Sequence, residues 1–456
     1  MERIETDLLV IGWGKAGKSL ARTLGSSGLA VVMVEQSRQM YGGTCINVAC
    51  VPTKALVHRA ELRRGTDSAA EWFARSVDER DTLTAKLRAR NHALLAEVGA
   101  VTVVDGRARF VGPREVEVAA GDDRLRITGR TVVVNTGTVP ARPDLPGVDG
   151  PRVHDSTTLQ HVDPLPGHLV VVGGGFVGLE FAGMFARFGS RVTLLNSAAR
   201  LLPREDPDVA EAVAAAMTDA GVELIHGVRA QGLVDDGSRV RVHHSGGIVD
   251  ADAVLVATGR SPSTDGLDLA AAGVQVDARG FVVVDEHLRT SAENVFAVGD
   301  VNGGPQFTYI SYDDHRIVLD QLVGEGSRRT TDRVAVPTTT FLTPPLSRVG
   351  LTETQARAKG LNVHVVAKAV ADIAAMPRPK ILGETHGLIK VVVDAGTGLV
   401  VGATLFCVDS QELVNLVALA MRAGVPAADL CDGIWTHPSS TEALNEVLAA
   451  LPGRAQ

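Results

Sequence analysis

Short apolar runs followed by glycine-rich turns recur along the chain, and they predict buried parallel strands. Residues 7–12 read DLLVIG and residues 168–173 read HLVVVG. Both runs are continuously apolar rather than alternating, which is typical of strands that are buried on both faces. Each run leads into a G-x-G-x-x-G turn, a helical stretch and a second apolar strand. The pattern therefore predicts two copies of one strand–helix–strand unit in an α/β fold.

The two turns match the dinucleotide-binding fingerprint. Their glycines are Gly12, Gly14 and Gly17 in the first copy, and Gly173, Gly175 and Gly178 in the second. In such a turn the first glycine permits the tight bend, the second lets a pyrophosphate approach the backbone, and the third lets helix and strand pack closely. The second strands end at Glu35 and Asn196, each 23 positions after the first glycine. One such motif is weak evidence, but two with equal spacing predict two dinucleotide sites.

The residues that end the second strands differ between the two copies. Glu35 suits the ribose hydroxyls of an adenosine, and the alternative is a solvated charge at a strand end. Asn196 can also bond a ribose, but it lacks the charge that would repel a 2′-phosphate. Arg200 is either a partner for such a phosphate or an ordinary surface arginine. The second site is therefore expected to take NADH or NADPH.

Three further apolar runs are expected to join the nucleotide sheets. TVVVNTG (131–137) and AVLVATGR (253–260) each end in Thr-Gly, so Thr136, Gly137 and Gly259 become candidate cofactor contacts. The run 292–301 ends in Gly299-Asp300. An acidic residue at the carboxyl end of a parallel strand suits a ribityl or ribose hydroxyl, and the alternative is a turn aspartate.

Composition excludes several classes of protein. The 456 residues carry a net charge of −8, with 45 basic and 53 acidic side chains, so a nucleic-acid-binding protein is not expected. We find no apolar stretch long enough to span a membrane and no secretory signal at the charged start MERIETD. Four cysteines are too few for a secreted disulfide scaffold. A cytoplasmic protein with no nucleic-acid or membrane partner is expected.

A pair of cysteines, Cys45 and Cys50, follows the first nucleotide unit. They can be buried structural residues, half of a zinc site, or a redox-active disulfide. No second cluster completes a zinc site, so no metal site is expected. The redox disulfide is favoured because the pair follows a dinucleotide fold and because Gly42-Gly43 lets the backbone approach a planar cofactor.

The segment GGTCINVACVPTK resembles the redox motif of the flavin-dependent pyridine nucleotide–disulfide oxidoreductases, such as dihydrolipoamide dehydrogenase, glutathione reductase and mercuric reductase. The resemblance covers essentially the whole chain, because GRSP (259–262), VFAVGDV and the C-terminal HPSSTE follow in family order. It implies an FAD enzyme that uses NADH or NADPH.

The resemblance also implies roles for individual residues. Cys50 resembles the flavin-facing thiol and Cys45 the interchange thiol that meets the substrate, with Gly43 and Thr44 of the same motif beside the cofactor. Lys54 and Glu180 resemble an ion pair next to the flavin, although Glu180 also suits the first turn of its helix. His437 and Glu442 match H-P-x-x-x-E, in which the histidine serves the disulfide of the other subunit of a homodimer.

Other segments narrow the resemblance. GWGKAGKSLA, TPPLSRVGLTE and LFCVDSQELVN resemble the bacterial reactive-chlorine resistance flavoproteins, which are similar to hypothiocyanous acid reductases and mercuric-reductase-like. The expected function is NAD(P)H-dependent reduction of hypothiocyanous acid or a related oxidant, an oxidative-stress activity that passes through Cys45. The alternatives are lipoamide or a low-molecular-weight disulfide, a metal ion such as copper or mercury, and a non-catalytic flavoprotein sensor. The chain shows no vicinal cysteine pair at its C-terminus, which weakens the mercury alternative.

The expected architecture has two Rossmann-like domains and a C-terminal α+β dimerisation domain. Residues 1–150 form the first part of the FAD domain, with a helical excursion near 55–97. Residues 151–270 form the NAD(P) domain, 271–335 complete the FAD domain, and 336–456 form the dimerisation domain.

A few other residues have open interpretations. Trp13 either shields the FAD pyrophosphate or fills a groove, and Asp313-Asp314 is expected to cap or support rather than to bind metal. Phe307 and Tyr309 either flank a cofactor ring or pack in the core. Lys15 and Lys18 either add charge near phosphate or are solvated, and Cys407 and Cys431 are expected to be structural.

Overall fold

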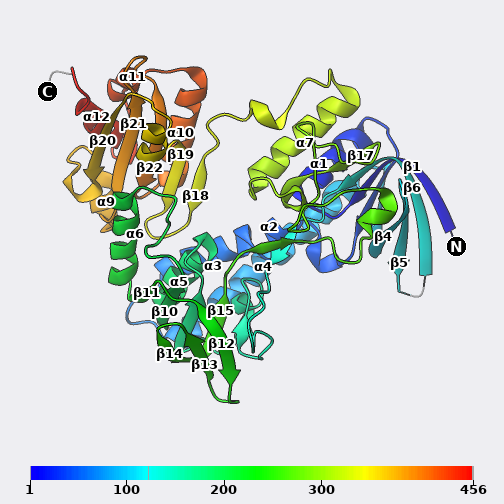
Figure 1. The fold of residues 1–456 in the computed structure, drawn as a ribbon, viewed down its shortest axis with the longest axis horizontal. Coiled ribbons are helices and arrows are strands. Elements are labelled where there is room, and N and C mark those ends of the chain that lie inside the picture. The colour runs from blue at the N-terminus through cyan, green and yellow to red at the C-terminus, as the bar shows by residue number, and fades with distance from the viewer. Residues whose placement is uncertain (1, 122, 454–456) are drawn as a thin grey trace. The chain divides into compact units, whose positions relative to one another are not determined.

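The computed structural model describes residues 2–121 and 123–453, which divide into two compact units (Figure 1). Unit 1 comprises Met1–Leu56, Arg75–Arg142 and Gly259–Asp332, and unit 2 comprises Val57–Ala74, Pro143–Thr258 and Arg333–Gln456. The chain returns to unit 1 at Gly259, where a short antiparallel ladder pairs β16 (Arg260–Pro262) with β7 (Thr138–Pro140). The domain bounds expected from the sequence, with the FAD domain resuming at residue 271, stay a prediction.

Unit 1 is built on a seven-stranded sheet of order β3-β2-β1-β6-β5-β4, with β17 pairing with β6. Its strands are β1 (Glu2–Ile11), β2 (Val31–Glu35), β3 (Val101–Asp105), β4 (Arg107–Gly112), β5 (Glu115–Ala120), β6 (Asp123–Val134) and β17 (Val295–Ala297). β1 pairs in parallel with β2 and β6, whereas β5 is antiparallel to both of its neighbours. The apolar run of β1 is buried because both faces of the sheet are covered.

The helices of unit 1 place the first glycine turn and the cysteines. They are α1 (Lys15–Ser26), α2 (Thr44–Asn47) and α7 (Thr308–Val323), with short 3-10 turns η1 (Arg38–Met40), η3 (Leu269–Ala272), η4 (Gly299–Asn302) and η5 (Thr330–Asp332). The helical excursion expected near 55–97 is two helices, α3 (Cys50–Glu61) and α4 (Ala69–Ala96), and both have residues in each unit. Buried small and apolar residues of α1 recur at helical spacing, so one face of α1 packs in the core.

Unit 2 contains the second nucleotide sheet, which is wholly parallel and has the order β11-β10-β9-β15-β8. Its elements are β8 (Val153–His154), η2 (Leu159–His161), β9 (His168–Val172), α5 (Phe176–Phe188), β10 (Arg191–Asn196), α6 (Pro207–Asp219), β11 (Val222–His226) and β15 (Ala253–Val256). A three-stranded antiparallel sheet precedes β15 in the chain and comprises β12 (Ala230–Asp235), β13 (Val240–His244) and β14 (Gly247–Ala251).

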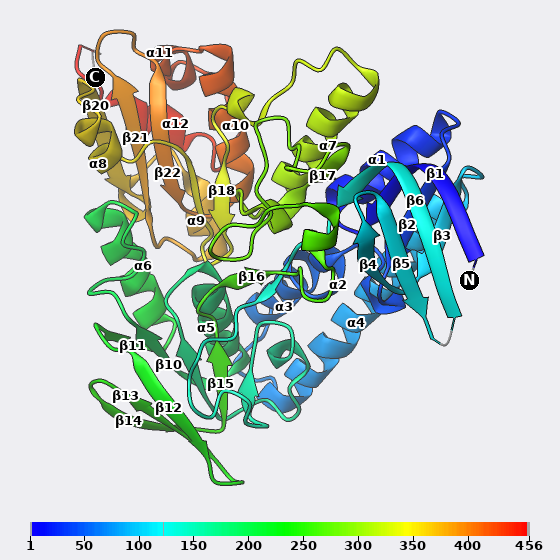
Figure 2. The ribbon, with the colours of Figure 1, turned by 45° about the vertical axis from the view of Figure 1, so that its right-hand side comes forward.

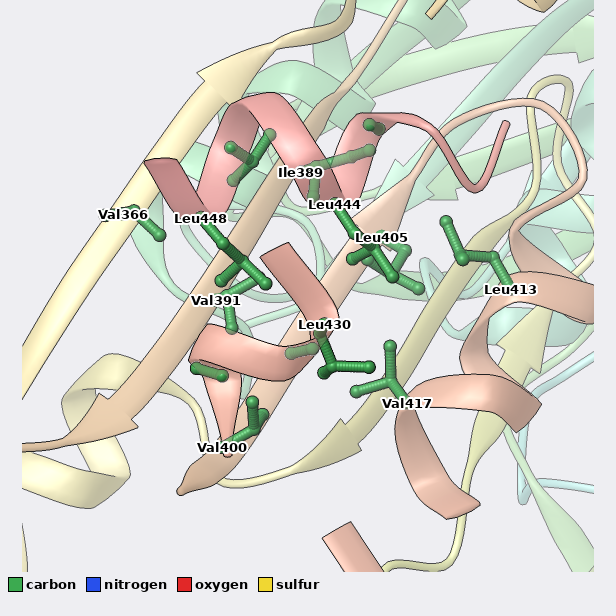
Figure 3. Packing of buried hydrophobic residues seen from close by; sticks show 14 of the residues in the cluster. Val366, Ile389, Val391, Val400, Leu405, Leu413, Val417, Leu430, Leu444 and Leu448 are labelled. Carbon is green, nitrogen blue, oxygen red and sulfur yellow. The ribbon is translucent and has the colours of Figure 1, made fainter. Parts of the chain in front are cut away.

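The C-terminal part of unit 2 is an antiparallel sheet of order β18-β19-β22-β21-β20 with helices beside it (Figure 2). Its elements are β18 (Thr338–Thr340), β19 (Leu346–Gly350), α8 (Glu353–Ala358), β20 (Val363–Ala369), η6 (Val370–Asp372), α9 (Pro377–Leu382), β21 (Leu388–Asp394), β22 (Val400–Phe406), α10 (Ser410–Ala423), α11 (Ala427–Cys431) and α12 (Ala443–Ala449). Side chains such as Val391, Leu413 and Leu444 form one core between sheet and helices (Figure 3). Cys407 and Cys431 are buried in this core, as a structural role requires.

A buried ion cluster ties α6, α8 and β21 together. The Lys390 side chain is 6% exposed, and its Nζ lies 3.1 Å from Asp206, 2.9 Å from Asp208 and 2.8 Å from Glu353. Burial alone would raise the pKa of Asp206, but hydrogen bonds from Thr354, Lys390 and the Glu353 N–H lower it to about 2. The cluster therefore stays ionised at neutral pH.

Replacement of Lys390 by methionine is expected to lower the free energy of unfolding by about 3–5 kcal/mol, because Asp206 is left as an unpaired buried charge. Denaturant titration followed by circular dichroism measures this change. Arg357→Met is the matched control, because its exposed pair with Glu353 contributes less than about 1 kcal/mol. A Lys390→Met protein as stable as Arg357→Met would contradict the expectation.

The low pKa of Asp206 means that its contribution to the free energy of unfolding is present above about pH 4 and is lost as the pH falls toward 2.

No helix in the described ranges combines the length and the apolar character that a membrane crossing requires.

Candidate functional site

The first glycine turn is held by a buried asparagine, Asn135, at the end of β6. Its Oδ1 accepts the Gly17 N–H at 2.8 Å, and its Nδ2 donates to the Val298 carbonyl at 2.7 Å. A Cβ on Gly14 would lie 2.3 Å from this side chain, and Gly12 has φ +94° with its Cβ position 2.6 Å from the Asn135 carbonyl. Both positions therefore require glycine, because any side chain would displace Asn135 from the turn.

Glu35 ends β2 beside this turn. One carboxylate oxygen accepts the Trp13 N–H at 3.0 Å and the other accepts the Ser37 N–H at 3.2 Å. Burial raises the pKa of Glu35, while these backbone bonds lower it. Trp13 is only 1% exposed, and its ring packs at 4.5 Å from the Tyr41 ring. Trp13 is therefore a core residue of the turn. The Glu35 carboxylate accepts two backbone N–H groups, and its contact with ribose hydroxyls stays a prediction.

The residues after β6 leave space and polar atoms for a ligand. A Cβ on Gly137 would meet only the Thr44 hydroxyl, at 3.9 Å. The Thr136 hydroxyl is buried and has no hydrogen-bond partner within the described part of the chain. Asp300 accepts from Thr138 at 3.0 Å, and Arg260 donates to the same hydroxyl at 2.7 Å.

Burial raises the pKa of Asp300, and its bond from Thr138 and the charge of Arg260 oppose the rise. This donor and acceptor set lies on the same unit as the first glycine turn. Together with the open position at Gly137, it fits an FAD.

The two cysteines lie on consecutive short segments of unit 1. Cys45 is on α2 and half-buried, and Cys50 is the first residue of α3 and exposed. A hydrogen bond with Cys50 and burial raise the pKa of Cys45, while the Thr308 hydroxyl and Lys18 lower it. The Thr308 hydroxyl also lies 3.7 Å from the Cys50 sulfur. The two cysteines therefore lie close enough to form a disulfide with each other, beside the N-terminus of α7.

The second glycine turn opens α5 in unit 2. Gly173 has φ +119°, and its Cβ position lies 2.5 Å from the Ala257 carbonyl. A Cβ on Gly175, by contrast, has no neighbour within 4 Å among the described residues. A Cβ on Gly178 would lie 1.9 Å from the Gly173 carbonyl oxygen, so this position also requires glycine. The open position at Gly175 precedes the positive end of α5, which fits the pyrophosphate of NAD(P)H.

The side chains of Asn196 and Arg200 form hydrogen bonds with the loop after β10. The Asn196 Nδ2 donates to the carbonyls of Ala198 and Arg200, both at 2.9 Å, and lies 3.2 Å from the His226 ring. The Arg200 guanidinium donates to the carbonyls of Pro203 and Glu205. Arg200 therefore helps to hold this loop, which neither interpretation from the sequence included, and its contact with a 2′-phosphate stays a prediction.

Substitution of Gly175 by alanine is expected to weaken NAD(P)H binding about 100-fold, because the new Cβ occupies the approach of the pyrophosphate. The thermal midpoint and FAD content are expected to stay unchanged, because the Cβ has no neighbour within 4 Å in the part of the chain that the structure describes. Stopped-flow reduction of the flavin by NADH and NADPH measures the change, and reduction by dithionite is the control. Normal NAD(P)H affinity in this variant would place the pyrophosphate elsewhere.

His437 and Glu442 form a pair at the surface of unit 2. The His437 Nδ1 lies 2.8 Å from a Glu442 carboxylate oxygen, and the other oxygen accepts the Ser439 N–H at 2.8 Å. These two hydrogen bonds lower the pKa of Glu442. The His437 side chain is 71% exposed, so its Nε2 edge is accessible to a partner.

The structure leaves the pairing of Lys54 with Glu180 as a prediction, because Lys54 belongs to unit 1 and Glu180 to unit 2. Glu180 is buried, and its carboxylate accepts the Phe341 N–H at 2.9 Å. The approach of His437 to the disulfide also stays a prediction. Gly259 lies where the chain returns to unit 1, and its carbonyl accepts the Ala141 N–H at 2.9 Å.

The remaining motif residues have supporting positions. Asp314 accepts the Gly299 N–H at 2.6 Å, and Asp313 pairs with Arg316 at 3.6 Å. In the described ranges no group of three His, Cys, Asp or Glu residues can hold a metal ion. Phe307 and Tyr309 stack with ring centroids 5.1 Å apart.

Sequence reasoning missed three residues that hold the site. Asn135 bonds to the first glycine turn, Thr138 bonds to Asp300, and Thr308 lies beside the cysteines. Asn135 and Thr138 flank the recognised Thr-Gly, and Thr308 lies between the two noted aromatics. Their roles depend on partners at sequence separations of 118, 162 and 258 residues, which no local motif records.

Comparison with known proteins decides the family. The model of the family described as "Pyridine nucleotide-disulphide oxidoreductase" matches residues 6–314, and that of its dimerisation domain matches residues 336–448. The chain belongs to this family. It is accordingly an oxidoreductase that uses FAD and NAD(P)H and acts on sulfur groups, with the α/β fold and the C-terminal module expected from the sequence.

Several relatives align over nearly the whole chain. The probable pyridine nucleotide-disulfide oxidoreductase RclA of Escherichia coli is 45% identical over 97% of this chain and 98% of its own length. A mercuric reductase of Staphylococcus aureus is 33% identical over 98% of this chain and 82% of its own. A dihydrolipoyl dehydrogenase of Geobacillus stearothermophilus is 32% identical over 96% and 94%.

Solved structures show the same fold. The Cu(II) complex of the HOCl-induced flavoprotein disulfide reductase RclA from Escherichia coli superimposes with a TM-score of 0.93 and 45% identity. The match covers 98% of this chain and 99% of that one. The chain is therefore similar to a flavoprotein disulfide reductase over nearly all of its length.

Proposed function

We propose that this enzyme passes electrons from NAD(P)H through a Cys45–Cys50 disulfide to hypothiocyanous acid or a related reactive oxidant in the cytoplasm. The adjacent cysteines beside Thr308 are the observation that carries the proposal. Similarity to an RclA protein described as HOCl-induced supports an oxidant as the class of substrate. Bound FAD would accept hydride from NAD(P)H and deliver two electrons to the disulfide.

The reduced cysteines then perform an ordinary thiol exchange. The Cys45 thiolate attacks the sulfur of hypothiocyanous acid and forms a Cys45 thiocyanate, while hydroxide leaves and takes up a proton to give water. Cys50 attacks the Cys45 sulfur, the disulfide forms again, and thiocyanate departs. The balance is one NAD(P)H consumed for each hypothiocyanous acid, which gives NAD(P)+, thiocyanate and water with no net uptake of protons.

We further propose that the enzyme is a homodimer in which His437, oriented by Glu442, supplies the proton to the disulfide of the partner subunit. The match to the family's dimerisation domain supports a homodimer. The exposed imidazole edge and the 2.8 Å bond to Glu442 support the histidine as the acid–base group.

A second candidate substrate is a metal ion. The relative solved with Cu(II) and the mercuric reductases favour it, and one NAD(P)H would reduce two Cu(II) to Cu(I) or one Hg(II) to mercury metal. The ion would act as a substrate at Cys45 and Cys50. Lipoamide is a third possibility, supported by the dihydrolipoyl dehydrogenases.

A steady-state panel separates these substrates. NADH and NADPH are each tested with hypothiocyanous acid, lipoamide, glutathione disulfide, Cu(II) and Hg(II), and kcat/KM is compared. We expect kcat/KM for hypothiocyanous acid to exceed that for every other acceptor. A higher value for lipoamide or a metal ion would assign the enzyme to that substrate, and no oxidation of NAD(P)H with any acceptor would point to a sensor.

A further inference from the structure

The lysine that directly follows the first glycine turn bonds to the segment that leads to the cysteines. Lys18 lies on α1, and its Nζ donates to the Gly42 carbonyl at 3.3 Å and to the Asn91 Oδ1 at 2.6 Å. Asn91 lies on α4, and its Nδ2 donates to the Leu87 carbonyl at 2.8 Å. That bond turns the amide oxygen toward Lys18, so the ammonium is bound by two protein oxygens.

These contacts fix the approach to the redox helix. Gly42 and Gly43 both have positive φ, at +99° and +76°, and they lead directly into α2. On the other side of this loop the Asn47 Nδ2 donates to the carbonyls of Tyr41 and Gly43. The loop is therefore held from α1 and α4 by Lys18 and from α2 by Asn47, and Cys45 lies between these two attachments.

The ammonium also acts on the thiol. Lys18 lowers the pKa of Cys45, against the hydrogen bond with Cys50 and the burial that raise it. The pKa of Lys18 itself is lowered to about 8 by burial and by Lys15, and Cys45 opposes this shift. The titratable groups facing Lys18 are thus Lys15 on α1 and Cys45 on α2, while Asn91 on α4 and the Gly42 carbonyl are neutral.

We propose that Lys18 is a positioning residue of the interchange thiol: it holds the Gly42 loop against α4 and places a positive charge beside the Cys45 thiolate. The inference rests on the role of Cys45 in the proposed function. An opposite charge nearby favours the ionised form of a thiol, and the thiolate is the reactive species. Because the ammonium titrates near pH 8, its effect is present below that pH and lost above it.

Alkylation of the reduced holoenzyme tests this assignment without any substrate. The protein is reduced anaerobically with dithionite, treated with iodoacetamide between pH 5 and 10, and the carbamidomethylation of Cys45 is followed by peptide mass spectrometry. Lys18→Met is expected to slow the modification of Cys45 about tenfold at pH 7, because a smaller fraction of the thiol is ionised at that pH without the neighbouring positive charge. FAD content and thermal midpoint report the integrity of the fold.

Two variants separate charge from shape. Lys18→Arg keeps a charge that does not titrate, so it is expected to match the wild type at pH 7 and to exceed it above pH 9. Lys15→Met removes the neighbouring ammonium, which lies over the Tyr312 ring at 4.7 Å, and it is expected to leave the Cys45 rate within about twofold.

An unchanged rate of Cys45 modification at pH 7 in Lys18→Met, or equal impairment in Lys18→Arg, would overturn the inference. Slower modification of Cys45 at pH 7 with unchanged oxidant turnover would instead support the positioning role and overturn the proposed role of Cys45 in catalysis.

Discussion

Substitution of Cys45 by serine is expected to reduce NAD(P)H-dependent oxidant reduction to less than about 0.1% of wild type, because the attacking thiolate is lost. The variant is expected to keep its FAD, since Cys45 lies on α2, outside the glycine turn and the Asp300 network. It is also expected to show a long-wavelength absorption band when Cys50 ionises beside the flavin. Stopped-flow spectroscopy and steady-state kinetics on the same sample measure both properties.

Two further variants make this result specific. Cys50→Ser is expected to be equally inactive but to lack the long-wavelength band, which distinguishes the flavin-facing thiol from the interchange thiol. Cys431→Ser is the matched control, because its buried sulfur donates to the Asn445 carbonyl at 3.3 Å and a hydroxyl can do the same. Full oxidant turnover by Cys45→Ser would exclude the thiol mechanism.

Replacement of His437 by alanine is expected to lower kcat/KM for the oxidant by about 10²–10⁴-fold, because proton transfer at the disulfide loses its acid–base group. Reduction of the flavin by NAD(P)H is expected to continue at the wild-type rate, since that half-reaction does not involve the histidine. Glu442→Gln is expected to give a smaller loss, because the amide oxygen can still accept a hydrogen bond from the imidazole N–H but carries no charge.

Mixing two inactive variants tests whether His437 acts across a dimer. A hybrid of one Cys45→Ser subunit and one His437→Ala subunit contains one complete site if the histidine serves its partner. In that hybrid the wild-type His437 of the first subunit faces the intact disulfide of the second. Recovery to about half of wild-type activity in co-expressed, differently tagged hybrids is expected if the two sites are independent. A hybrid as inactive as its parents would show that the histidine serves its own chain.

Much of the candidate site was accessible from the sequence because its chemistry lies in short local motifs. The glycine turns, the cysteine pair and the H-P-x-x-x-E segment each act over a few residues, and their backbone requirements restrict the residue types. The same reasoning located the strands that flank the two glycine turns but described α3 and α4 as one helical stretch. The segment between them contains Gly65 and Ser68, residues that favour the end of one helix and the start of the next, and this local signal was missed.

Distant contacts could not be found in this way. Asn135 holds a turn 118 positions away, and Arg260 reaches Thr138 across the ladder that brings the chain back to unit 1. Lys18 is the clearest case. The sequence suggested a phosphate contact or a solvated residue, whereas the structure shows hydrogen bonds to the Gly42 carbonyl and the Asn91 side chain.

The four cysteines show the same difference between what local sequence determines and what tertiary packing determines. The sequence by itself determined the family, the two nucleotide units and the candidate redox pair, because each depends on local spacing and on the conformations that glycine allows. Only the tertiary structure decided which side chains surround Cys45 and which core buries Cys407 and Cys431. A pKa depends on burial and on charges brought together through space, and these are set by packing between segments that are far apart in the chain.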